Sequence, residues 1–289
     1  MSGNESKRRI SCLQIRISIV FLILLIAACF AGPCFSGYGE YEIFYDAGGT
    51  RVLSMEAPSE LHILGTDKNG QDIMIRLLYG GRISLLLALA AVILQTVIGV
   101  LVGLVAGYRG KGTDMVLMRV TDVINALPDI VIILILSSVL VAYGVGGRER
   151  ILMLLLFLSA FGWTFIAKIV RSQVLYVRES AFMMAAELCG IPTYRRLIIH
   201  LLPNVMGQVM AAIPVSIGNI ILIESTLSFL GFGLPYPYAS WGNMLNAGLD
   251  LRILANHVNI WLPPGLLTVA TVAAFHILGE GLKGRKECR

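Results

Sequence analysis

Long apolar runs alternate with short polar segments along the chain, and six of these runs are long enough to cross a bilayer. An α-helix rises about 1.5 Å per residue, so about 20 apolar residues span the hydrocarbon core. The runs of this length lie near 15–34, 83–107, 117–142, 151–169, 209–230 and 260–281. The pattern predicts an all-α integral membrane protein, built as a six-helix transmembrane bundle.

The composition indicates the same class. The chain has 289 residues, of which 56% are hydrophobic and only 14% are charged, whereas soluble domains carry about 25% charged residues. A water-soluble fold of this size has no room to bury so much apolar surface. The five cysteines are scattered, without a Cys-x-x-Cys pair or a Cys/His cluster. The sequence therefore predicts no metal site and no disulfide framework.

The distribution of Lys and Arg predicts the orientation, because cytoplasmic loops carry an excess of these residues. Segments 1–16, 108–119, 168–208 and 282–289 hold 4, 3, 5 and 4 of the 23 Lys and Arg residues. The remaining seven lie in the segments on the other side. We therefore expect both termini in the cytoplasm, with 168–208 as the longest cytoplasmic loop.

The first apolar run follows Lys7, Arg8 and Arg9 and ends at the letters AACFAG. Cleaved signal peptides and retained membrane anchors share this arrangement. The run is long for a signal peptide, so a retained anchor is the favoured interpretation.

The second run contains the letters GVLVGLVAG, in which Gly99, Gly103 and Gly107 recur every four residues. Residues at this spacing lie on one helix face, and small residues there let a neighbouring backbone approach closely. We expect tight helix packing along this stripe.

The third run carries polar residues at helical spacing. Asp122, Asn125 and Asp129 lie at i, i+3 and i+7 and so share one helix face, and Pro128 should kink the helix. Carboxylates at membrane depth are costly unless they contact protein or water, so we expect this face to point into the bundle. It could line a pathway, or Asp122 could pair with Arg119.

The fifth run contains Glu224, with Ser225 and Ser228 close behind it. A carboxyl group among apolar neighbours within a membrane is a functional candidate by default. Three roles are open for Glu224: a proton relay, a group that lines the pathway, or a structural hydrogen-bonding partner.

The cytoplasmic segment Phe182–Asn204 is too interrupted to cross a bilayer, and its pattern predicts two short helices. Gly190 can end the first helix in a left-handed conformation, and Pro192 suits the first turn of the second. Pro203 with Asn204 is expected to break the second helix before the fifth run. Such a hairpin could lie on the inner leaflet, cap the bundle, or bind a peripheral protein.

The letters MAAELCGIPTYRRLIIHLLPN resemble the coupling loop of permease subunits of ATP-binding-cassette importers. The pattern of that family is Glu-Ala-Ala, three residues, Gly, nine residues, then an Ile shortly before Leu-Pro. Met184 stands where the family usually has Glu, and His200 stands at the Ile position. The resemblance implies that the ATPase is bound by Met184, Ala185, Ala186, Gly190, Arg195, Arg196, Leu202 and Pro203.

Three further stretches resemble the dipeptide, oligopeptide and nickel permease family, specifically its second or C-type subunit. They are HILGTDKNGQDIMIRLLYGGRISL at 62–85, ESTLSFLGFGLPYPYASWGNML at 224–245 and FHILGEGLKGR at 275–285. Gln71 replaces the usual Arg of the first motif. The resemblance covers the chain from about residue 62 to its end.

The resemblance implies a type I importer permease fold in the bacterial inner membrane, crossing it several times. Residues 1–61 would form the cytoplasmic tail, first helix and extracytoplasmic segment, and 62–289 the permease domain. The implied partners are a homologous permease subunit in a heterodimer, two ATPase subunits and a solute-binding protein. The solute-binding protein would dock on outer residues Gly65, Thr66, Asp67, Gly70, Asp72, Trp241, Gly242 and Asn243.

The sequence predicts no catalytic residue and no cofactor in this chain. It has no Gly-x-x-x-x-Gly-Lys-Ser/Thr loop to hold phosphates, so ATP and Mg²⁺ would be used by the partner ATPases. The implied substrate is a peptide, nickel or a metal chelate. The rival function is a proton-coupled secondary transporter that uses Glu224 and Asp129, although the inverted repeat common in such folds is not evident.

Overall fold

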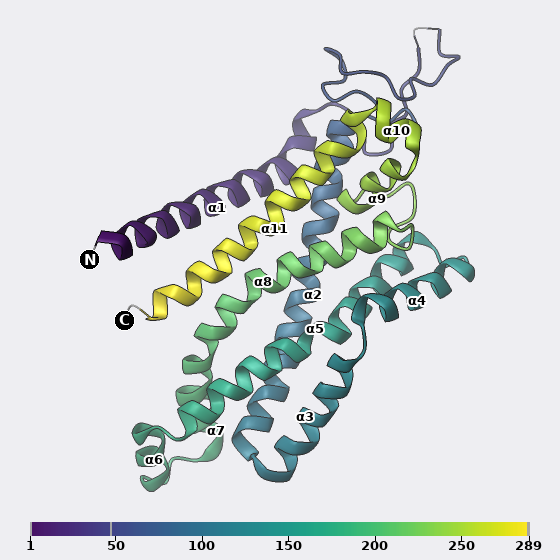
Figure 1. Cartoon of the computed structure of the whole chain (residues 1–289). Helices are drawn as coiled ribbons and strands as arrows, with labels where there is room; N and C mark the ends of the chain where they lie inside the picture. The colour runs from purple at the N-terminus through teal and green to yellow at the C-terminus, as the bar shows by residue number, and fades with distance from the viewer. Residues whose placement is uncertain (1, 47, 288–289) are drawn as a thin grey trace.

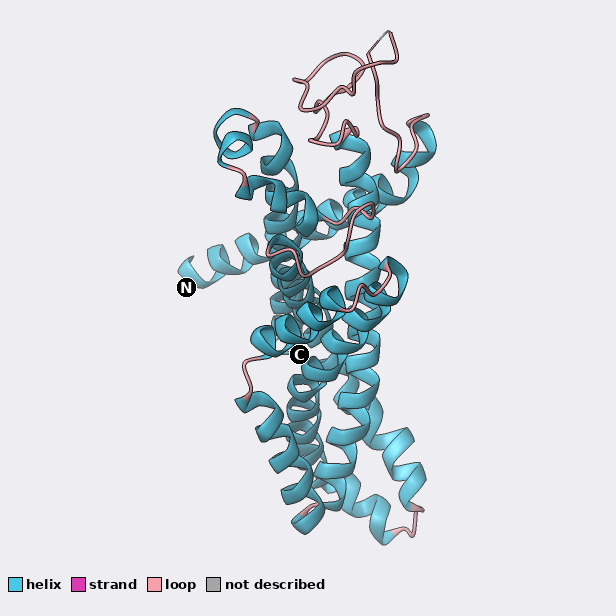
Figure 2. Cartoon of the chain, turned by 90° about the vertical axis from the view of Figure 1, so that its right-hand side faces the viewer, coloured by secondary structure: helices cyan, strands magenta, loops and turns pink. Residues whose placement is uncertain are grey.

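The computed structural model describes residues 2–46 and 48–287, and these residues form helices joined by turns and loops (Figures 1 and 2). The only strand pairing in this part of the chain is two isolated bridges, Tyr45 with Val52 and Thr66 with Asp72. The α-helices are α1 Ser2–Phe35, α2 Ile73–Arg109, α3 Lys111–Ala126, α4 Asp129–Ala142, α5 Gly147–Arg178, α6 Ala181–Leu188, α7 Thr193–Arg195, α8 Leu202–Phe229, α9 Trp241–Leu245, α10 Leu251–Asn256 and α11 Val258–Glu287.

Five helical segments are long and apolar enough to cross a membrane, and a bent pair makes a sixth. The five are Leu13–Phe35, Ile73–Arg109, Gly147–Arg178, Thr193–Phe229 and Val258–Lys283. The sixth consists of α3 and α4, which meet at an angle of 71°. Each predicted run corresponds to one of these segments, so the all-α prediction is confirmed, with five spanning helices or six when α3 and α4 count as one span.

The bend between α3 and α4 lies at Leu127 and Pro128. Leu127 is extended, with φ −82° and ψ 134°, as expected for a residue before proline. Pro128 has no N–H to continue the α3 ladder, and α4 begins at the next residue, Asp129. The predicted kink is confirmed, and it is a complete break of the helix.

The expected break at Pro203 is wrong. A π-helical turn, Arg196–Leu201, joins α7 to α8, so one helical segment runs from Thr193 to Phe229. Pro203 is the second residue of α8 and follows this turn directly. The wider π-helical turn before it accommodates the proline ring, as local π geometry often does at such positions.

The glycine stripe of α2 packs against α5, which confirms the predicted close approach. A Cβ atom at Gly99 would lie 2.7 Å from the carbonyl oxygen of Trp163, and one at Gly103 would lie 2.6 Å from that of Ala167. At Gly107 it would lie 2.7 Å from Val174. These two helices therefore form a closely packed pair, which we call the α2–α5 spine.

Helix α1 is held to the spine by one arginine. Arg82 of α2 donates hydrogen bonds to the carbonyl oxygens of Cys29 and Phe30 of α1, each at 2.6 Å. Its guanidinium also lies over the ring of Tyr79, 4.8 Å from the centroid. Helix α1 packs against α11 as well, and the two helices run side by side in Figure 1.

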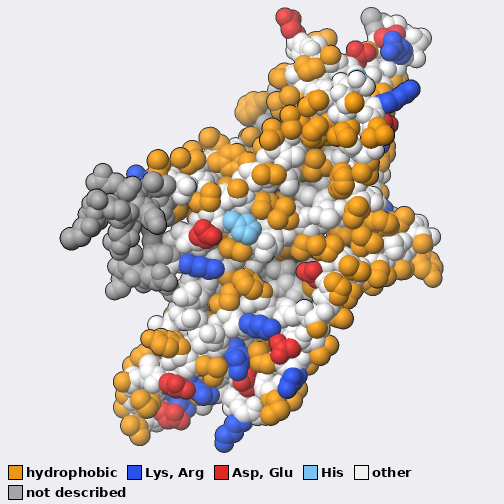
Figure 3. All heavy atoms as spheres, viewed as in Figure 1, with side chains coloured by type: hydrophobic (Ala, Val, Ile, Leu, Met, Phe, Trp, Pro, Cys, Tyr) orange, Lys and Arg blue, Asp and Glu red, His pale blue; other side chains and the backbone are white. Residues whose placement is uncertain are grey.

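The connecting segments gather at two opposite ends of the bundle. The segment 36–72 lies with α10 at one end, and α6 and α7 lie at the other (Figure 1). On the face shown in Figure 3, charged side chains cluster near α6 and α7, while the surface over α4 is mainly apolar. The first end includes the predicted outer loops, and the second includes the predicted coupling loop.

We predict that Gly103→Ala destabilises the spine, because the added methyl group meets the backbone of α5 rather than a movable side chain. Overpacking of this kind costs about 1–3 kcal/mol. Thermal unfolding of the purified protein in detergent should show a lower Tm than the parent.

Gly112→Ala is the matched control, because a Cβ atom at Gly112 has nothing within 4 Å. Alanine has a higher helix propensity than glycine, so the control should keep or raise the Tm. An unchanged Tm in Gly103→Ala would contradict the close packing described above.

Candidate functional site

A cavity of about 430 Å³ lies where α2, α3, α4, α5 and α8 meet. Its wall is mainly apolar, with side chains such as Ile133, Phe161 and Phe165. Six polar side chains also line it: Gln95, Asn125, Asp129, Thr164, Ser216 and Asn219. We call it the central cavity.

The break between α3 and α4 brings two of the predicted polar residues to this cavity. Asn125 lies in the last turn of α3, and its Oδ1 accepts a hydrogen bond from Thr164 Oγ1 at 2.8 Å. Asp129 opens α4, and its Oδ1 accepts from the N–H of Ile130 at 2.8 Å. Both residues also line a smaller hollow of about 140 Å³ beside the central cavity.

Asp122 does not share this environment. Its carboxylate forms an ion pair with Lys168 of α5 at 2.9 Å, so the expected pairing with Arg119 is wrong. Both side chains of the pair are about half exposed, and neither lines the central cavity. All three polar residues are exposed, so the expectation that this face is buried in the bundle is wrong, although Asn125 and Asp129 do line the central cavity.

Glu224 is enclosed in a hydrogen-bonded junction between α2 and α8. Its side chain is 2% exposed, and it accepts hydrogen bonds from Ser228 Oγ at 2.8 Å and from Ser84 Oγ at 3.2 Å. The N–H of Trp241 in turn donates to Ser84 Oγ at 3.4 Å. Glu224 does not line the central cavity, so this geometry favours the structural role among the three considered.

Ser225 lies beside this junction and is also buried. Its hydroxyl oxygen has no hydrogen-bond partner among the described residues. Ser225 is closely packed against α9, because a Cβ atom added at Gly242 would lie 2.6 Å from its Cα. Both facts place Ser225 in the interior, away from the central cavity.

Gln95, Thr164, Ser216 and Asn219 line the central cavity but were not singled out in the sequence. Gln95 is 3% exposed, and its Nε2 donates to the carbonyl of Leu158 at 2.8 Å. A polar amide within an apolar run is a signal that could have identified Gln95 and Asn219, since such residues rarely face lipid.

The first helix of the predicted coupling loop ends as expected. Gly190 has φ +71°, its N–H donates to the carbonyl of Glu187, and the N–H of Ile191 donates to that of Ala186. This pair of bonds is the Schellman arrangement of a helix C-terminus. Glu187 also pairs with Arg196 at 3.0 Å, which ties α6 to the π-helical turn.

The hairpin presents an apolar surface, which we call the coupling patch. Met183, Ala186 and Leu201 are buried against the bundle, whereas Leu188 is 88% exposed and Met184 is 54% exposed. Ala185, Arg195 and Pro203 are also exposed, and Leu202 is partly buried. The large exposed apolar side chains of the patch are Phe182, Met184, Leu188, Tyr194, Ile198 and Ile199.

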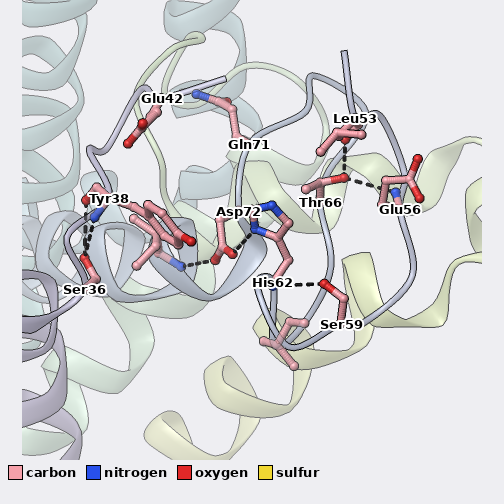
Figure 4. Close-up of polar contacts among 12 residues, drawn as sticks. Ser36, Tyr38, Glu42, Leu53, Glu56, Ser59, His62, Thr66, Gln71 and Asp72 are labelled. Atoms are coloured by element: carbon pink, nitrogen blue, oxygen red, sulfur yellow. Dashed lines mark hydrogen bonds and ion pairs between the residues drawn. The ribbon is translucent and has the colours of Figure 1, made fainter. Parts of the chain in front are cut away.

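At the opposite end, several residues predicted to dock a partner hold the outer segment together (Figure 4). Asp72 caps α2 by accepting from the N–H of Ile75 at 2.9 Å, and its other oxygen lies 2.8 Å from His62 Nδ1. Thr66 accepts from the N–H of Glu56 at 3.0 Å. Asp72, His62 and Thr66 are all buried.

Asp67, Gly65 and Gly70, in the loop that precedes α2, are buried as well. Asp67 is buried and forms an ion pair with Arg76 at 3.4 Å. Gly65 and Gly70 have φ +81° and +76°, a conformation that favours glycine. These residues shape the loop, and their docking role stays a prediction.

Trp241 is fully buried, so its side chain is not an exposed interface anchor or a boundary tryptophan. Its Nε1 donates to the carbonyl of Leu77 at 3.0 Å. Gly242 is buried against α8, and Asn243 completes a capping box at the start of α9. The three residues fix α9 to the bundle.

Residues 99–285, more than half of the chain, match the family described as "Binding-protein-dependent transport system inner membrane component". The chain belongs to this family. The permease is therefore an inner-membrane subunit of an ATP-binding-cassette importer, and a component of such a system works with ATPase subunits and a solute-binding protein. The match begins within α2, and the predicted domain boundary at 61/62 stays a prediction.

Named relatives support the same assignment. An oligopeptide transport system permease protein of Bacillus subtilis is 32% identical over 268 residues, covering 92% of this chain and 83% of the relative. A dipeptide transport system permease protein of the same species is 38% identical over 226 residues, covering 78% and 68%. A glutathione transport system permease protein of Pectobacterium atrosepticum is 33% identical over 267 residues, covering 91% and 83%.

We predict that Glu224→Leu destabilises the permease, because it leaves the buried hydroxyls of Ser84 and Ser228 without their acceptor. An unpaired buried polar group costs about 1–3 kcal/mol, so thermal unfolding in detergent should show a lower Tm.

Glu224→Gln keeps an acceptor at this position and should retain both the Tm and ATP-driven uptake. If Glu224 relayed protons, Glu224→Gln would lose uptake, because glutamine cannot carry the proton. Loss of uptake in Glu224→Gln with an unchanged Tm would therefore contradict the structural role.

Proposed function

We propose that this permease imports peptides and forms one half of the translocation pathway, with a related permease subunit as the other half. The observation that carries the peptide assignment is the set of relatives named as oligopeptide, dipeptide and glutathione permeases. The central cavity supports it, because mainly apolar walls with a few amides and hydroxyls suit varied side chains and peptide groups.

The coupling patch is proposed to bind a cleft on an ATPase subunit. Exposed Leu188, Ile198 and Ile199 form an apolar surface that water does not favour. The segment that contains the patch, 168–208, holds five of the 23 Lys and Arg residues, which supports a cytoplasmic location and, with it, cytoplasmic termini.

One continuous helical segment connects the coupling patch with the central cavity. The segment Thr193–Phe229 begins at the patch, passes Ser216 and Asn219 at the central cavity, and reaches Glu224 near the other end. Because the helix does not break at Pro203, movement of the patch by the ATPase would tilt α8 as a rigid rod. Rigid-body tilting of this kind would alternate access to the cavity.

The extracytoplasmic end is proposed to receive the solute-binding protein. The partner would contact exposed residues of the outer segment rather than the buried set that shapes it. Tyr41, Tyr45, Leu61 and Ile63 are large exposed side chains there, and aromatic residues are common at protein interfaces.

The proton-coupled alternative has less support in the geometry. It requires Glu224 and Asp129 to act in one relay. Glu224 is enclosed with Ser84 and Ser228, whereas Asp129 lines the central cavity, which Glu224 does not reach.

We predict that Leu188→Glu uncouples the permease without unfolding it. The side chain is 88% exposed, so a charge there costs little in the free permease but would be buried unpaired against an ATPase cleft. The variant should enter the membrane normally, lose co-purification with the ATPase subunits, and lose ATP-driven peptide uptake.

Leu251→Glu is the matched control, because Leu251 is also strongly exposed but lies in α10 at the opposite end. It should co-purify with the ATPase as the parent does. Retained ATPase binding and uptake in Leu188→Glu would exclude the patch as the docking surface.

A further inference from the structure

We propose that Asp129 binds the ammonium group of the transported peptide in the central cavity. This inference rests on the proposed function, since it assumes that the central cavity belongs to the peptide pathway. It adds a chemical requirement: the ligand carries a primary ammonium group next to an apolar remainder.

The charge of the cavity wall points to a cation. Asp129 is the only ionisable side chain among the described residues that line the cavity, and no Lys, Arg or His is among them. Asp129 is exposed to the cavity rather than buried in the protein, and an intramembrane carboxylate that faces a cavity marks a ligand pathway. A cationic ligand is attracted to this carboxylate, whereas an anionic ligand is repelled.

The protein itself does not neutralise Asp129. Within the described part of the chain, Asp129 takes part in no ion pair. The nearby cation Lys168 is already paired with Asp122. One oxygen of Asp129 accepts from the N–H of Ile130, and no described residue donates to the other. The N-terminus of α4 also favours negative charge at this position.

The remaining polar atoms suit an ammonium group with three N–H donors. Gln95 uses Nε2 as a donor to Leu158, which leaves Oε1 as an acceptor. Ser216 is buried and lines the cavity, so its hydroxyl oxygen offers a further acceptor there. A metal ion fits less well, because Asp129 is a single carboxylate and the described residues contain no group of three or more His, Cys, Asp or Glu placed to hold one.

The experiment uses the complete membrane complex in lipid nanodiscs without the solute-binding protein, so that only the permease selects the ligand. The probe is a tripeptide, alanyl-photoleucyl-alanine, which is cross-linked by light and located by mass spectrometry. Trialanine and N-acetyl-trialanine then compete for labelling, and they differ by one ammonium group.

In the parent complex, the label should fall on residues that line the central cavity. Trialanine should displace it at a concentration about tenfold lower than N-acetyl-trialanine, which is the factor expected of one charge-assisted hydrogen bond. Asp129→Asn should make the two competitors equal, and Asp129→Glu should restore the difference. Asp122→Asn is the matched control and should keep the parent's tenfold preference, because Asp122 lies outside the cavity.

Equal competition in the parent, or a preference that survives in Asp129→Asn, would overturn the inference. So would labelling that falls elsewhere or does not occur at all. Uptake of trialanine by the parent complex with its binding protein tests the proposed function separately. Uptake without labelling at the cavity would reject the ammonium site alone, whereas failure of uptake would reject the peptide assignment.

Discussion

Hydrocarbon offers no hydrogen-bonding partners, and this constraint governs the whole arrangement. Every backbone N–H and carbonyl within the membrane must be satisfied by the protein or by water in a cavity. Long unbroken helices meet this requirement almost everywhere in the bundle. The one break within a span, at Leu127 and Pro128, lies where α3 and α4 border the central cavity and its smaller neighbour. The break in the helix and the cavity therefore occur together, because backbone groups freed by the break need hydrogen-bonding partners that the cavity can supply.

The bundle combines a closely packed helix pair with one long helix that runs past the central cavity. The spine is fixed, because its three glycines bring the backbones of α2 and α5 within contact distance. Helix α8 is continuous from the coupling patch to the Glu224 junction. At that junction α8 is also hydrogen-bonded to the spine, because Ser84 of α2 donates to Glu224.

Much of the fold follows from the sequence because hydrophobic length and helix-breaking residues act locally. The six runs, the break at Pro128 and the glycine stripe are all found in the structure. The left-handed Gly190 is also found. The sequence predicts a helix break at Pro203, but a π-helical turn just before it keeps the helix continuous, and no local sequence pattern reveals such a turn. The partner of Asp122 depends on the register between α3 and α5, and that register is fixed by tertiary packing.

The candidate sites were predicted less completely than the fold. A motif shows that residues matter, but it does not distinguish residues that contact a partner from residues that shape a loop. Trp241, Thr66 and Asp72 lie in such motifs and are buried. Gln95 and Asn219, by contrast, belong to no motif and line the central cavity. Gln95 and Asn219 reach the cavity because of the way the helix faces pack together, and that packing is set by tertiary structure rather than by the local sequence.

Arg178, the last residue of α5, ties two helix ends together at the same end of the bundle as the coupling patch. It donates to the carbonyl oxygens of Gly107 and Tyr108 at 3.1 and 3.3 Å, so the ends of α2 and α5 are joined. A hollow of about 230 Å³ lies between this joint and the Glu187–Arg196 pair. One wall of this hollow therefore belongs to the joined ends of α2 and α5, and the other belongs to the hairpin, so a shift of the hairpin relative to the spine would change the width of the hollow.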